Sequence, residues 1–403
     1  MMRKGCRGNR RQFLQAGSVL AAGLCYSMDH LAAMTRAEET PGRRANSTGA
    51  KVAIVSCPTY GAEVRGALKR CFDLLGGVGA LARGKTVTVK INLTGTSFLP
   101  FLGRPVGESY MTHYATVLAL TDLLFANGAR RVRLVESTNS LASLRESLVL
   151  ADWGVAALEA LGRVEFENTR NLGDGKRYAT LKVPGGGYLF SSFDLNHSYA
   201  DTDAFISLTK LKYHVTAGVT LSMKNLFGIT PNSLYGDEAG SEEARAGRGP
   251  LHGPGAGQTP ERAENFQLPG MKVKFLEAPR DPGLRVPRTI ADLCAARPVD
   301  LAIIDGITTM TSGEGPWCVD QRARLVKPGL LIAGLNPVST DAVAAALMGV
   351  DNPRAQRGTA PFAHCENHLL LAEKAGIGVA DLGKIEILGS TIEKSRFPFP
   401  GAS

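Results

Sequence analysis

Short apolar runs that alternate with helical patterns restrict the fold of this chain more than any other feature. Six runs have the length and composition of buried strands: residues 52–56, 86–92, 131–136, 204–208, 301–305 and 329–335. The amphipathic helices predicted between them are residues 114–127, 147–161, 289–296 and 341–348. Continuous apolar strands need cover on both faces, and helical crossovers connect parallel strands. The sequence therefore predicts a three-layer α/β fold, with a mostly parallel sheet between two layers of helices.

The limits of this domain follow from the segments around it. Residues 384–388 form a short apolar run that completes the sheet, so we expect the α/β domain over residues 51–392 and a tail over residues 393–403. Residues 235–288 break the alternation with a polar sequence rich in Gly and Pro. A stretch of this length without regular structure inside a compact domain is usually a lid, an insertion or disordered.

The N-terminal segment, residues 1–37, resembles a twin-arginine export signal. Arg10 and Arg11 are followed by a Phe-Leu pair and then by an apolar run over residues 16–24. That run is too short to span a bilayer as a helix of the mature protein. Residues 38–50 are polar and are predicted to be a linker. We therefore expect export by the twin-arginine machinery to the periplasm or another extracytoplasmic space, with no membrane span in the mature form.

Charge and cysteine content exclude some partners and cofactors. The formal net charge of +9 falls to +4 without residues 1–37, and no stripe of Lys and Arg is interleaved with aromatic residues. We therefore predict no nucleic-acid partner. Five cysteines remain beyond the signal and none forms a C-x-x-C pair, so the chain has no local iron–sulfur or structural zinc motif. Twin-arginine substrates often fold around a cofactor before export, which leaves a bound metal or prosthetic group open.

Polar residues close several of the predicted strands. Lys90 and Asn92 end the second strand, Glu136 ends the third, and Asp305 and Asn336 end two later ones. In open α/β sheets, ligands bind in the crevice outside the carboxyl ends of the strands. Each of these residues alone could simply meet water or cap a helix. Together they predict a binding site at this edge of the sheet.

A basic stretch lies where the strand at residues 204–208 gives way to a predicted helix. Lys210, Lys212 and His214 recur at every second position, so they share one side of an extended chain. The apolar spacing becomes helical after residue 214, which places Lys224 and Asn225 near the far end of that helix. The N–H groups and dipole of a helix N-terminus also attract anions. This pattern predicts a site for a small anion; a solvated basic edge is the alternative.

Two carboxylates mark a second cluster. Asp305 ends its strand, and Glu314 lies between two glycines in the loop that follows. These carboxylates, with Glu136, could hold a hard divalent cation, or they could serve as acid and base. Alternatively, Asp305 caps the turn after its strand.

Two shorter patterns have ordinary explanations. Residues 339–341, Ser-Thr-Asp, are predicted to be a helix N-cap followed by an acid of the first turn. His364 and His368 are four residues apart and could form a metal pair on one helix, although a surface pair at a helix start is commoner.

Three motifs together resemble the family catalogued as domain of unknown function 362. They are K-I-N-L from Lys90, K-x-K-x-H-x-x-x-G-V-T-L-S-M-K-N-L-F-G from Lys210, and L-A-I-I-D-G-I with the later G-E-G-P from Leu301. Two further runs near the C-terminus also match, so the resemblance covers roughly residues 51–390. Some members of the family are fused to ferredoxin-like iron–sulfur modules, whose cysteine runs this chain lacks. The resemblance implies a fold and a site but no reaction.

Two functions fit the predicted site. The first is an exported enzyme, metal-dependent or not, that acts on a small anionic substrate such as a carboxylate or phosphate. Its predicted catalytic residues are His214, Lys212 and Lys224. Its predicted substrate-binding residues are Lys90, Asn92, Lys210, Asn225 and Asn336. Its predicted metal ligands are Asp305, Glu314 and Glu136. The second function is a non-catalytic protein that holds an anion or cofactor in the same crevice.

Overall fold

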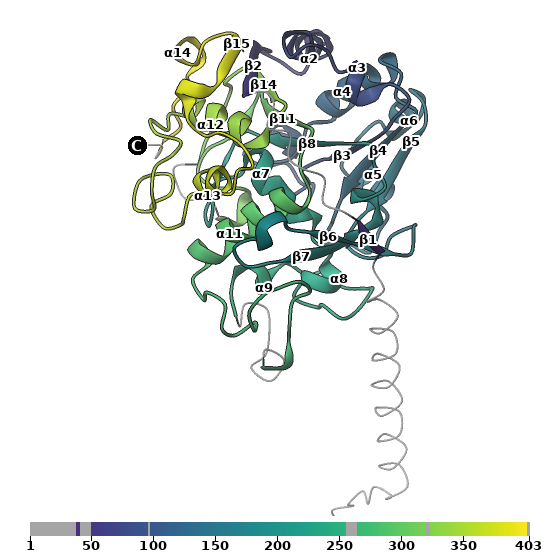
Figure 1. Cartoon of the computed structure of the whole chain (residues 1–403). Helices are drawn as coiled ribbons and strands as arrows, with labels where there is room; N and C mark the ends of the chain where they lie inside the picture. Colours follow the sequence, from purple (N-terminus) through teal and green to yellow (C-terminus); the bar gives the residue numbers. More distant parts are fainter. Residues whose placement is uncertain (1–37, 41–49, 96, 255–263, 319–322, 401–403) are drawn as a thin grey trace, which may run out of the picture.

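A large sheet forms the centre of the protein (Figure 1). The computed structural model describes residues 38–40, 50–95, 97–254, 264–318 and 323–400 of the 403-residue chain. The strands of the main sheet are β2 (Lys51–Ser56), β3 (Thr86–Lys90), β4 (Arg131–Glu136), β5 (Val164–Asn168), β8 (Ala204–Lys210), β11 (Leu301–Gly306), β14 (Leu330–Gly334) and β15 (Glu386–Gly389). Their order is β15-β2-β14-β11-β8-β3-β4-β5. All seven apolar runs identified in the sequence are strands of this sheet, which confirms the predicted α/β fold.

One strand of the main sheet runs against the others. β14 is antiparallel to both of its neighbours, β11 and β2, whereas every other pair in the sheet is parallel. The carboxyl end of β14 therefore lies at the opposite edge of the sheet from the carboxyl ends of the other seven strands. This orientation has consequences for the predicted site.

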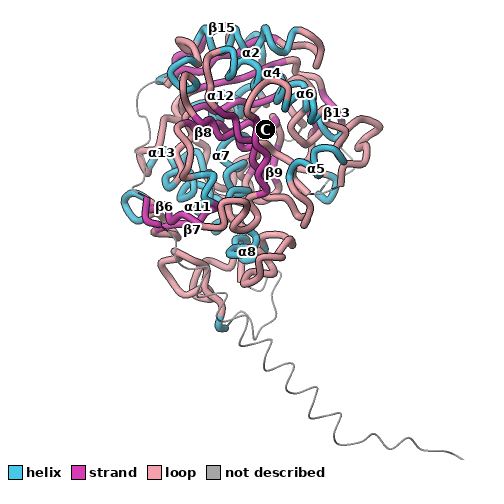
Figure 2. Tube along the Cα trace, turned by 90° about the vertical axis from the view of Figure 1, so that its right-hand side faces the viewer, coloured by secondary structure: helices cyan, strands magenta, loops and turns pink. Residues whose placement is uncertain are grey.

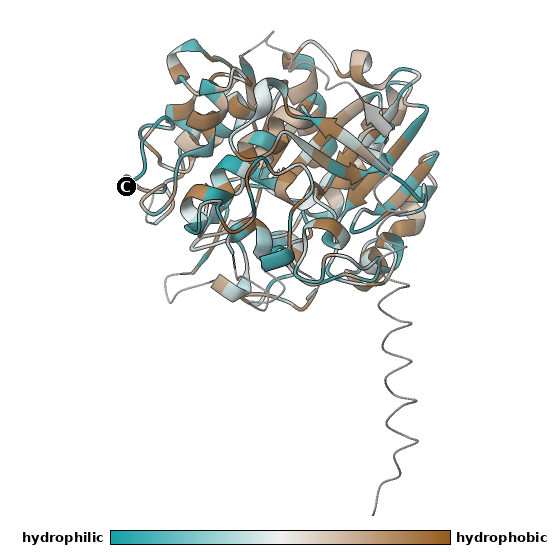
Figure 3. Ribbon diagram, turned by 60° about the horizontal axis from the view of Figure 1, so that its bottom comes forward, coloured by the Kyte–Doolittle hydropathy of each residue, from teal (hydrophilic) through white to brown (hydrophobic). Residues whose placement is uncertain are grey.

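Helices cover both faces of the main sheet. The helices packed on one face are α2 (Glu63–Leu74), α3 (Gly79–Ala82), α4 (Tyr114–Ala126), α5 (Leu144–Leu150) and α6 (Val155–Glu159). The helices on the other face are α7 (Leu221–Asn225), α11 (Pro282–Ala296), α12 (Pro337–Leu347) and α13 (His368–Lys374). Alternate residues of β11 enter the two cores, Leu301 and Ile303 on one side and Ala302 and Ile304 on the other. The central strands β8, β11 and β14 are buried along their whole length, and hydrophobic segments run through the strands of the sheet (Figure 3).

A smaller sheet lies below the main one in both views of the chain (Figures 1 and 2). It consists of β1 (Glu38–Thr40), β6 (Tyr178–Lys182) and β7 (Ser192–Asn196), in the order β1-β6-β7. β1 pairs in parallel with β6, so part of the predicted linker is a strand. The sequence of β1, Glu-Glu-Thr, contains no apolar residue, so the apolar pattern of the sequence could not predict this strand.

The remaining elements are short. They include two ribbons, β9 (Tyr213–His214) with β10 (Gly218–Val219) and β12 (Thr309–Met310) with β13 (Leu325–Val326), and the helices α8 (Asn232–Tyr235), α9 (Gly249–His252) and α14 (Ile392–Ser395). The 3₁₀ turns are η1 (Val106–Glu108), η2 (Pro184–Gly186), η3 (His197–Tyr199), η4 (Leu226–Ile229), η5 (Pro316–Cys318) and η6 (Leu382–Lys384).

Three expected segments differ from the sequence prediction. The helix predicted at residues 147–161 is two helices, α5 and α6, because the chain turns through a positive φ of 60° at Asp152 between them. In the predicted insertion at residues 235–288, the described parts bury Leu251 and Phe275 in the core. The predicted tail also packs inward, and Phe399 is 2% exposed.

The predicted export signal lies outside the described residues, because residues 1–37 are not part of them. Within the described part of the chain, no helix is both long and apolar enough to cross a membrane.

Candidate functional site

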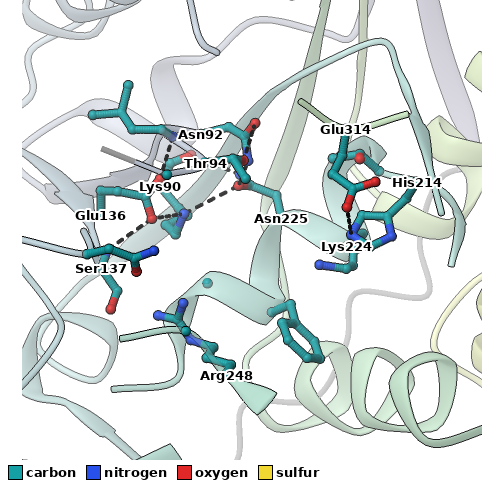
Figure 4. A pocket seen from close by; sticks show the side chains of 17 residues that line it. Lys90, Asn92, Thr94, Glu136, Ser137, His214, Lys224, Asn225, Arg248 and Glu314 are labelled. Carbon is teal, nitrogen blue, oxygen red and sulfur yellow. Dashed lines mark hydrogen bonds and ion pairs between the residues drawn. The ribbon is translucent and has the colours of Figure 1, made fainter. Parts of the chain in front are cut away.

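A cavity of about 140 Å³ opens at the carboxyl ends of β3 and β4. Figure 4 shows the side chains that line it, which come from these strand ends, from α7 and from loops far apart in the sequence. The predicted site residues that line it are Lys90, Asn92, Glu136, His214, Lys224, Asn225 and Glu314. The structure thus brings seven of the eleven predicted residues to one cavity.

One end of the cavity holds a buried ion pair. The Nζ of Lys90 lies 2.6 Å from the Oε1 of Glu136, and both side chains are at most 5% exposed. The same Oε1 accepts a hydrogen bond from the backbone N–H of Ser137, and the Oε2 accepts one from that of Leu93. Burial lowers the pKa of Lys90, and the charge of Glu136 opposes this shift. A buried pair with these additional hydrogen bonds is a rigid wall of the cavity.

Two amides connect this wall to α7. The Oδ1 of Asn225 accepts hydrogen bonds from Lys90 at 3.3 Å and from the Nδ2 of Asn92 at 3.1 Å. The Nδ2 of Asn225 donates to the Oγ of Ser207 on β8 at 3.0 Å. Asn225 therefore holds the end of α7 against β3 and β8, and its amide is already occupied by protein partners.

The structure corrects the helix predicted after residue 214. Residues 213–219 form the ribbon β9–β10, and α7 begins only at Leu221. Gly218 makes this ribbon possible, since its φ is 76° and a Cβ there would lie 2.6 Å from the ring of Phe362. The chain therefore turns back at the position where the apolar spacing suggested a continuous helix.

The N-terminus of α7 is not free to bind an anion. The carboxylate of Asp341 on α12 accepts hydrogen bonds from the backbone N–H groups of Ser222 at 2.9 Å and Met223 at 2.8 Å. Burial raises the pKa of Asp341 to about 7. Asp341 was predicted to serve its own helix, but Asn336 is the N-cap of α12 and Asp341 caps α7 instead. The helix-dipole argument for the anion site is therefore wrong.

Lys210 lies in a closed cluster that does not line the cavity. Its Nζ is 3.3 Å from the Oδ2 of Asp305 and donates to the backbone carbonyl of Thr308 at 2.8 Å. The hydroxyls of Tyr60 and Thr116 donate to Asp305 at 2.9 and 3.1 Å. Both members of the ion pair are 0% exposed. Lys210 was predicted to bind substrate and Asp305 to bind a metal; neither lines the cavity, because each is enclosed by protein partners.

Lys212 is likewise enclosed. Its Nζ donates to the backbone carbonyls of Tyr110 at 2.7 Å and Glu314 at 2.9 Å, and the side chain is 0% exposed. Burial lowers the pKa of Lys212 to about 7. Lys212 thus holds the loop that carries Glu314 and has no surface in the cavity.

Lys224 differs from the other lysines of the site. It lines the cavity and is partly exposed there. Within the described part of the chain its Nζ has no hydrogen-bond acceptor or carboxylate partner, and it lies 4.2 Å from the centroid of the Phe227 ring. Burial lowers the pKa of Lys224 to about 7; Glu314 opposes the shift, and the charges of Arg248 and Lys90 add to it.

His214 and Glu314 lie beside Lys224 at this end of the cavity (Figure 4). The Nδ1 of His214 accepts a hydrogen bond from the backbone N–H of Thr216 at 3.1 Å, so the neutral ring carries its proton on Nε2. That Nε2 lies 3.8 Å from the Oε1 of Glu314. Burial and the charge of Lys224 hold the pKa of His214 well below its usual range. His214 is therefore a neutral hydrogen-bond donor near pH 7.

Sequence reasoning missed Arg248. It lines the cavity, and its Nε and Nη2 donate to the backbone carbonyl of Thr230, while Nη2 also reaches the Oδ1 of Asn232 at 3.2 Å. The residue lies in the Gly-rich segment that was predicted to be an insertion or lid. A lone arginine between glycines has no periodic pattern that would place it at a strand edge.

Asn336 does not lie at the cavity. It follows β14, whose reversed direction carries it to the opposite edge of the sheet. There its Oδ1 accepts hydrogen bonds from the backbone N–H groups of Val338 and Ser339, which begin α12. Asn336, predicted to bind substrate, therefore does not line the cavity, since that prediction assumed that β14 runs parallel to its neighbours.

No metal site is assembled from the predicted ligands. Glu136 pairs with Lys90, Asp305 belongs to the Lys210 cluster, and Glu314 lies 3.8 Å from the Nε2 of His214. Across the described ranges, no three His, Cys, Asp or Glu side chains are grouped so as to hold a metal ion. His364 and His368, considered as a metal pair on one helix, do not share a surface: His364 is exposed, whereas His368 is fully buried at the start of α13.

Comparisons with known proteins identify a family. No curated protein matches the chain. A structure of the lactate racemase apoprotein from Thermoanaerobacterium thermosaccharolyticum is similar to this chain, with a TM-score of 0.39 and 14% sequence identity. The similar region covers 72% of this chain and 54% of that protein. Residues 87–346 match the family described as Domain of unknown function (DUF362). These residues include β3, β8, α7 and the loop of Glu314, so the match covers the cavity as well as most of the sheet. The chain belongs to the DUF362 family.

Proposed function

We propose that this chain is an exported protein that binds a small carboxylate or phosphate anion in the cavity beside Lys224. The observation that carries the proposal is the amine of Lys224, which faces the cavity without an acceptor among the described residues. Burying a charge is costly unless a partner of opposite charge compensates it. A bound anion would supply that partner.

The charges around the cavity support an anion rather than a cation. Lys90, Lys224 and Arg248 line it together with two carboxylates, Glu136 and Glu314. With the neutral His214 left out, the cationic groups exceed the acidic ones by one. A ligand with one negative charge would balance the cavity, whereas a metal cation would increase the excess.

The size of the cavity limits the ligand. A volume of about 140 Å³ leaves room for several waters or for a small organic anion. The ligand class is thus a phosphate, a short carboxylate or a small molecule that carries one of these groups.

The proposed site could also catalyse proton transfer through Lys224. A pKa of about 7 allows Lys224 to accept or donate a proton near neutral pH, where acid–base catalysts work best. The depressed pKa of His214 makes its ring a weak base, so Lys224 is the better candidate for proton transfer. His214 would instead orient the ligand through its Nε2–H group. A binding protein without catalysis would use the same contacts, and turnover separates the two.

The test is anion binding measured by calorimetry on the folded chain, with acetate, pyruvate and inorganic phosphate as probes. We expect Lys224→Met to weaken binding at least about tenfold, since it removes an unpaired charge while keeping an unbranched side chain. Lys374→Met, at an exposed position in the last turn of α13, is the matched control and should bind as the wild type does. Equal affinities in the wild type and Lys224→Met would refute the proposed site.

A further inference from the structure

We propose that Lys224 is a nucleophile whose amine forms an imine with the carbonyl carbon of a small anionic oxo compound. The inference rests on the proposed function, because the anionic group of that compound must first be held in the same cavity. It adds a reaction and a narrower substrate class, the oxo acids and the phosphorylated aldehydes and ketones.

The first support is the contrast among the buried lysines at this edge of the sheet. Lys90 pairs with Glu136, Lys210 pairs with Asp305, and Lys212 donates to two backbone carbonyls. The amine of Lys224 has no such acceptor among the described residues and faces the cavity. Only an amine that is not held by an acceptor can present its lone pair to an incoming carbon.

The second support is the surroundings of this amine. On one side it packs against the ring of Phe227, 4.2 Å from the centroid, which excludes water from that side. The positive charges of Arg248 and Lys90 also act on it. Desolvation and neighbouring cations are the two influences that produce nucleophilic lysines in enzymes. They lower the pKa of Lys224 to about 7, so a large fraction of the amine is neutral at neutral pH.

The third support is the placement of the other charged groups. Arg248 is anchored by Thr230 and Asn232, so its guanidinium is fixed at the cavity wall, where it can pair with the carboxylate or phosphate of the ligand. Glu314 lies at the same end of the cavity as Lys224 (Figure 4), and its charge raises the pKa of that amine. In an oxo acid the carboxylate and the carbonyl carbon are adjacent, so the anionic group would lie between Arg248 and Lys224, with the carbonyl carbon at the amine of Lys224.

The reaction balances without an oxidant or reductant. The nitrogen of Lys224 forms a bond to the carbonyl carbon, and the π electron pair of the C=O bond moves to the oxygen, which gains a proton as the nitrogen loses one. The nitrogen then gives up its second proton and forms the C=N bond with the electron pair of the broken N–H bond, while the C–O bond breaks and the departing hydroxyl takes up that proton and leaves as water. Glu314, which lies at the same end of the cavity as Lys224 (Figure 4), would relay these protons between the nitrogen and the oxygen. One carbonyl and one amine thus give one imine and one water.

The experiment traps the imine on the full chain with sodium cyanoborohydride in the presence of pyruvate, followed by intact mass measurement and peptide mapping. We expect one reduced adduct per chain on the peptide that contains Lys224. Lys224→Arg should lose the adduct, and Lys374→Arg should keep it. Acetone, which lacks an anionic group, should give no adduct, and inorganic phosphate should reduce trapping of pyruvate by competition.

The outcomes separate this inference from the proposed anion site. Pyruvate that binds by calorimetry and is not trapped overturns the imine and leaves the anion site standing. Adducts spread over surface lysines, or trapping that acetone matches, also overturn the imine. Absence of both binding and trapping overturns the two proposals together. The wild-type peptide map decides the matter even if Lys224→Arg fails to fold.

Discussion

Lys212 and Lys224 form an instructive pair, since they lie twelve residues apart on the same motif and their pKa values are both lowered to about 7, chiefly by burial. Their surroundings are nonetheless opposite. Lys212 is fully buried and donates to two backbone carbonyls, whereas Lys224 is partly exposed in the cavity and has no acceptor among the described residues. The difference teaches that a depressed pKa does not by itself mark a functional lysine. The geometry of the acceptors decides whether the amine supports the fold or meets a ligand.

The largest loss of stability is expected when the fully buried ion pair of Lys210 and Asp305 is broken. Asp305→Asn leaves the charge of Lys210 buried without a carboxylate, and breaking a buried pair in this way costs about 3–5 kcal/mol. Denaturant unfolding followed by circular dichroism measures the loss. A double variant, Lys210→Met with Asp305→Asn, should recover part of it because no uncompensated charge remains. An unfolding free energy in Asp305→Asn equal to that of the wild type would show that the pair is not enclosed as described.

A smaller loss of stability is expected for Lys212→Met, and it should exceed the loss for Lys224→Met. Lys212→Met removes the donor from the carbonyls of Tyr110 and Glu314, and such buried unpaired groups cost about 1–3 kcal/mol. Lys224→Met leaves no acceptor unpaired and should change the unfolding free energy by less than about 0.5 kcal/mol. Denaturant unfolding of the two variants side by side tests the contrast. Equal losses in both would remove the distinction between a supporting and an available lysine.

The pH dependence of the unfolding free energy tests the burial of Lys212 in a second way. The pKa of Lys212 is about 7 in the folded chain and 10.5 in its ordinary state, so between these values the unfolded chain binds more protons. Stability therefore rises with pH over this window, because it rises wherever the unfolded state is the more protonated one. The rise should be smaller in Lys212→Met. A pH dependence in Lys212→Met equal to that of the wild type would contradict the assignment.

The fold could be predicted from the sequence wherever burial leaves a continuous apolar run. The run at residues 301–305 predicted β11, since both of its faces are covered. β5 has no such run because it is an edge strand with the sequence VEFEN and is partly exposed. The direction of β14 was also hidden, because an apolar run has the same composition in either direction. That one reversal placed Asn336 at the wrong edge.

The site was harder to predict because the acceptors of a lysine are usually distant in sequence. The pattern around Lys210 and Lys212 showed two cations at a strand end, but Tyr60 and the backbone carbonyl of Tyr110, which enclose them, are more than 100 residues away. Backbone acceptors have no signature in the side chains. Arg248 was missed for a related reason, since its position depends on the path of a Gly-rich loop.

The last prediction concerns the affinity for an anion as the pH changes. Acetate keeps one negative charge between pH 6 and 9, so any change in its affinity over that range comes from the protein. Lys224 loses its proton as the pH rises through about 7, and affinity should therefore fall, by at most about tenfold or 1.4 kcal/mol for each pH unit. His214 does not contribute, because its pKa is held well below its usual range and the ring is already neutral.

Calorimetry with acetate at several pH values measures this dependence in the wild type and in two variants. Lys224→Met should bind weakly with a flat profile, whereas Lys212→Met should keep the fall in affinity, because Lys212 has no surface in the cavity. A flat profile in the wild type would mean that Lys224 keeps its charge across the range. A profile abolished by Lys212→Met but not by Lys224→Met would reverse the roles of the two lysines.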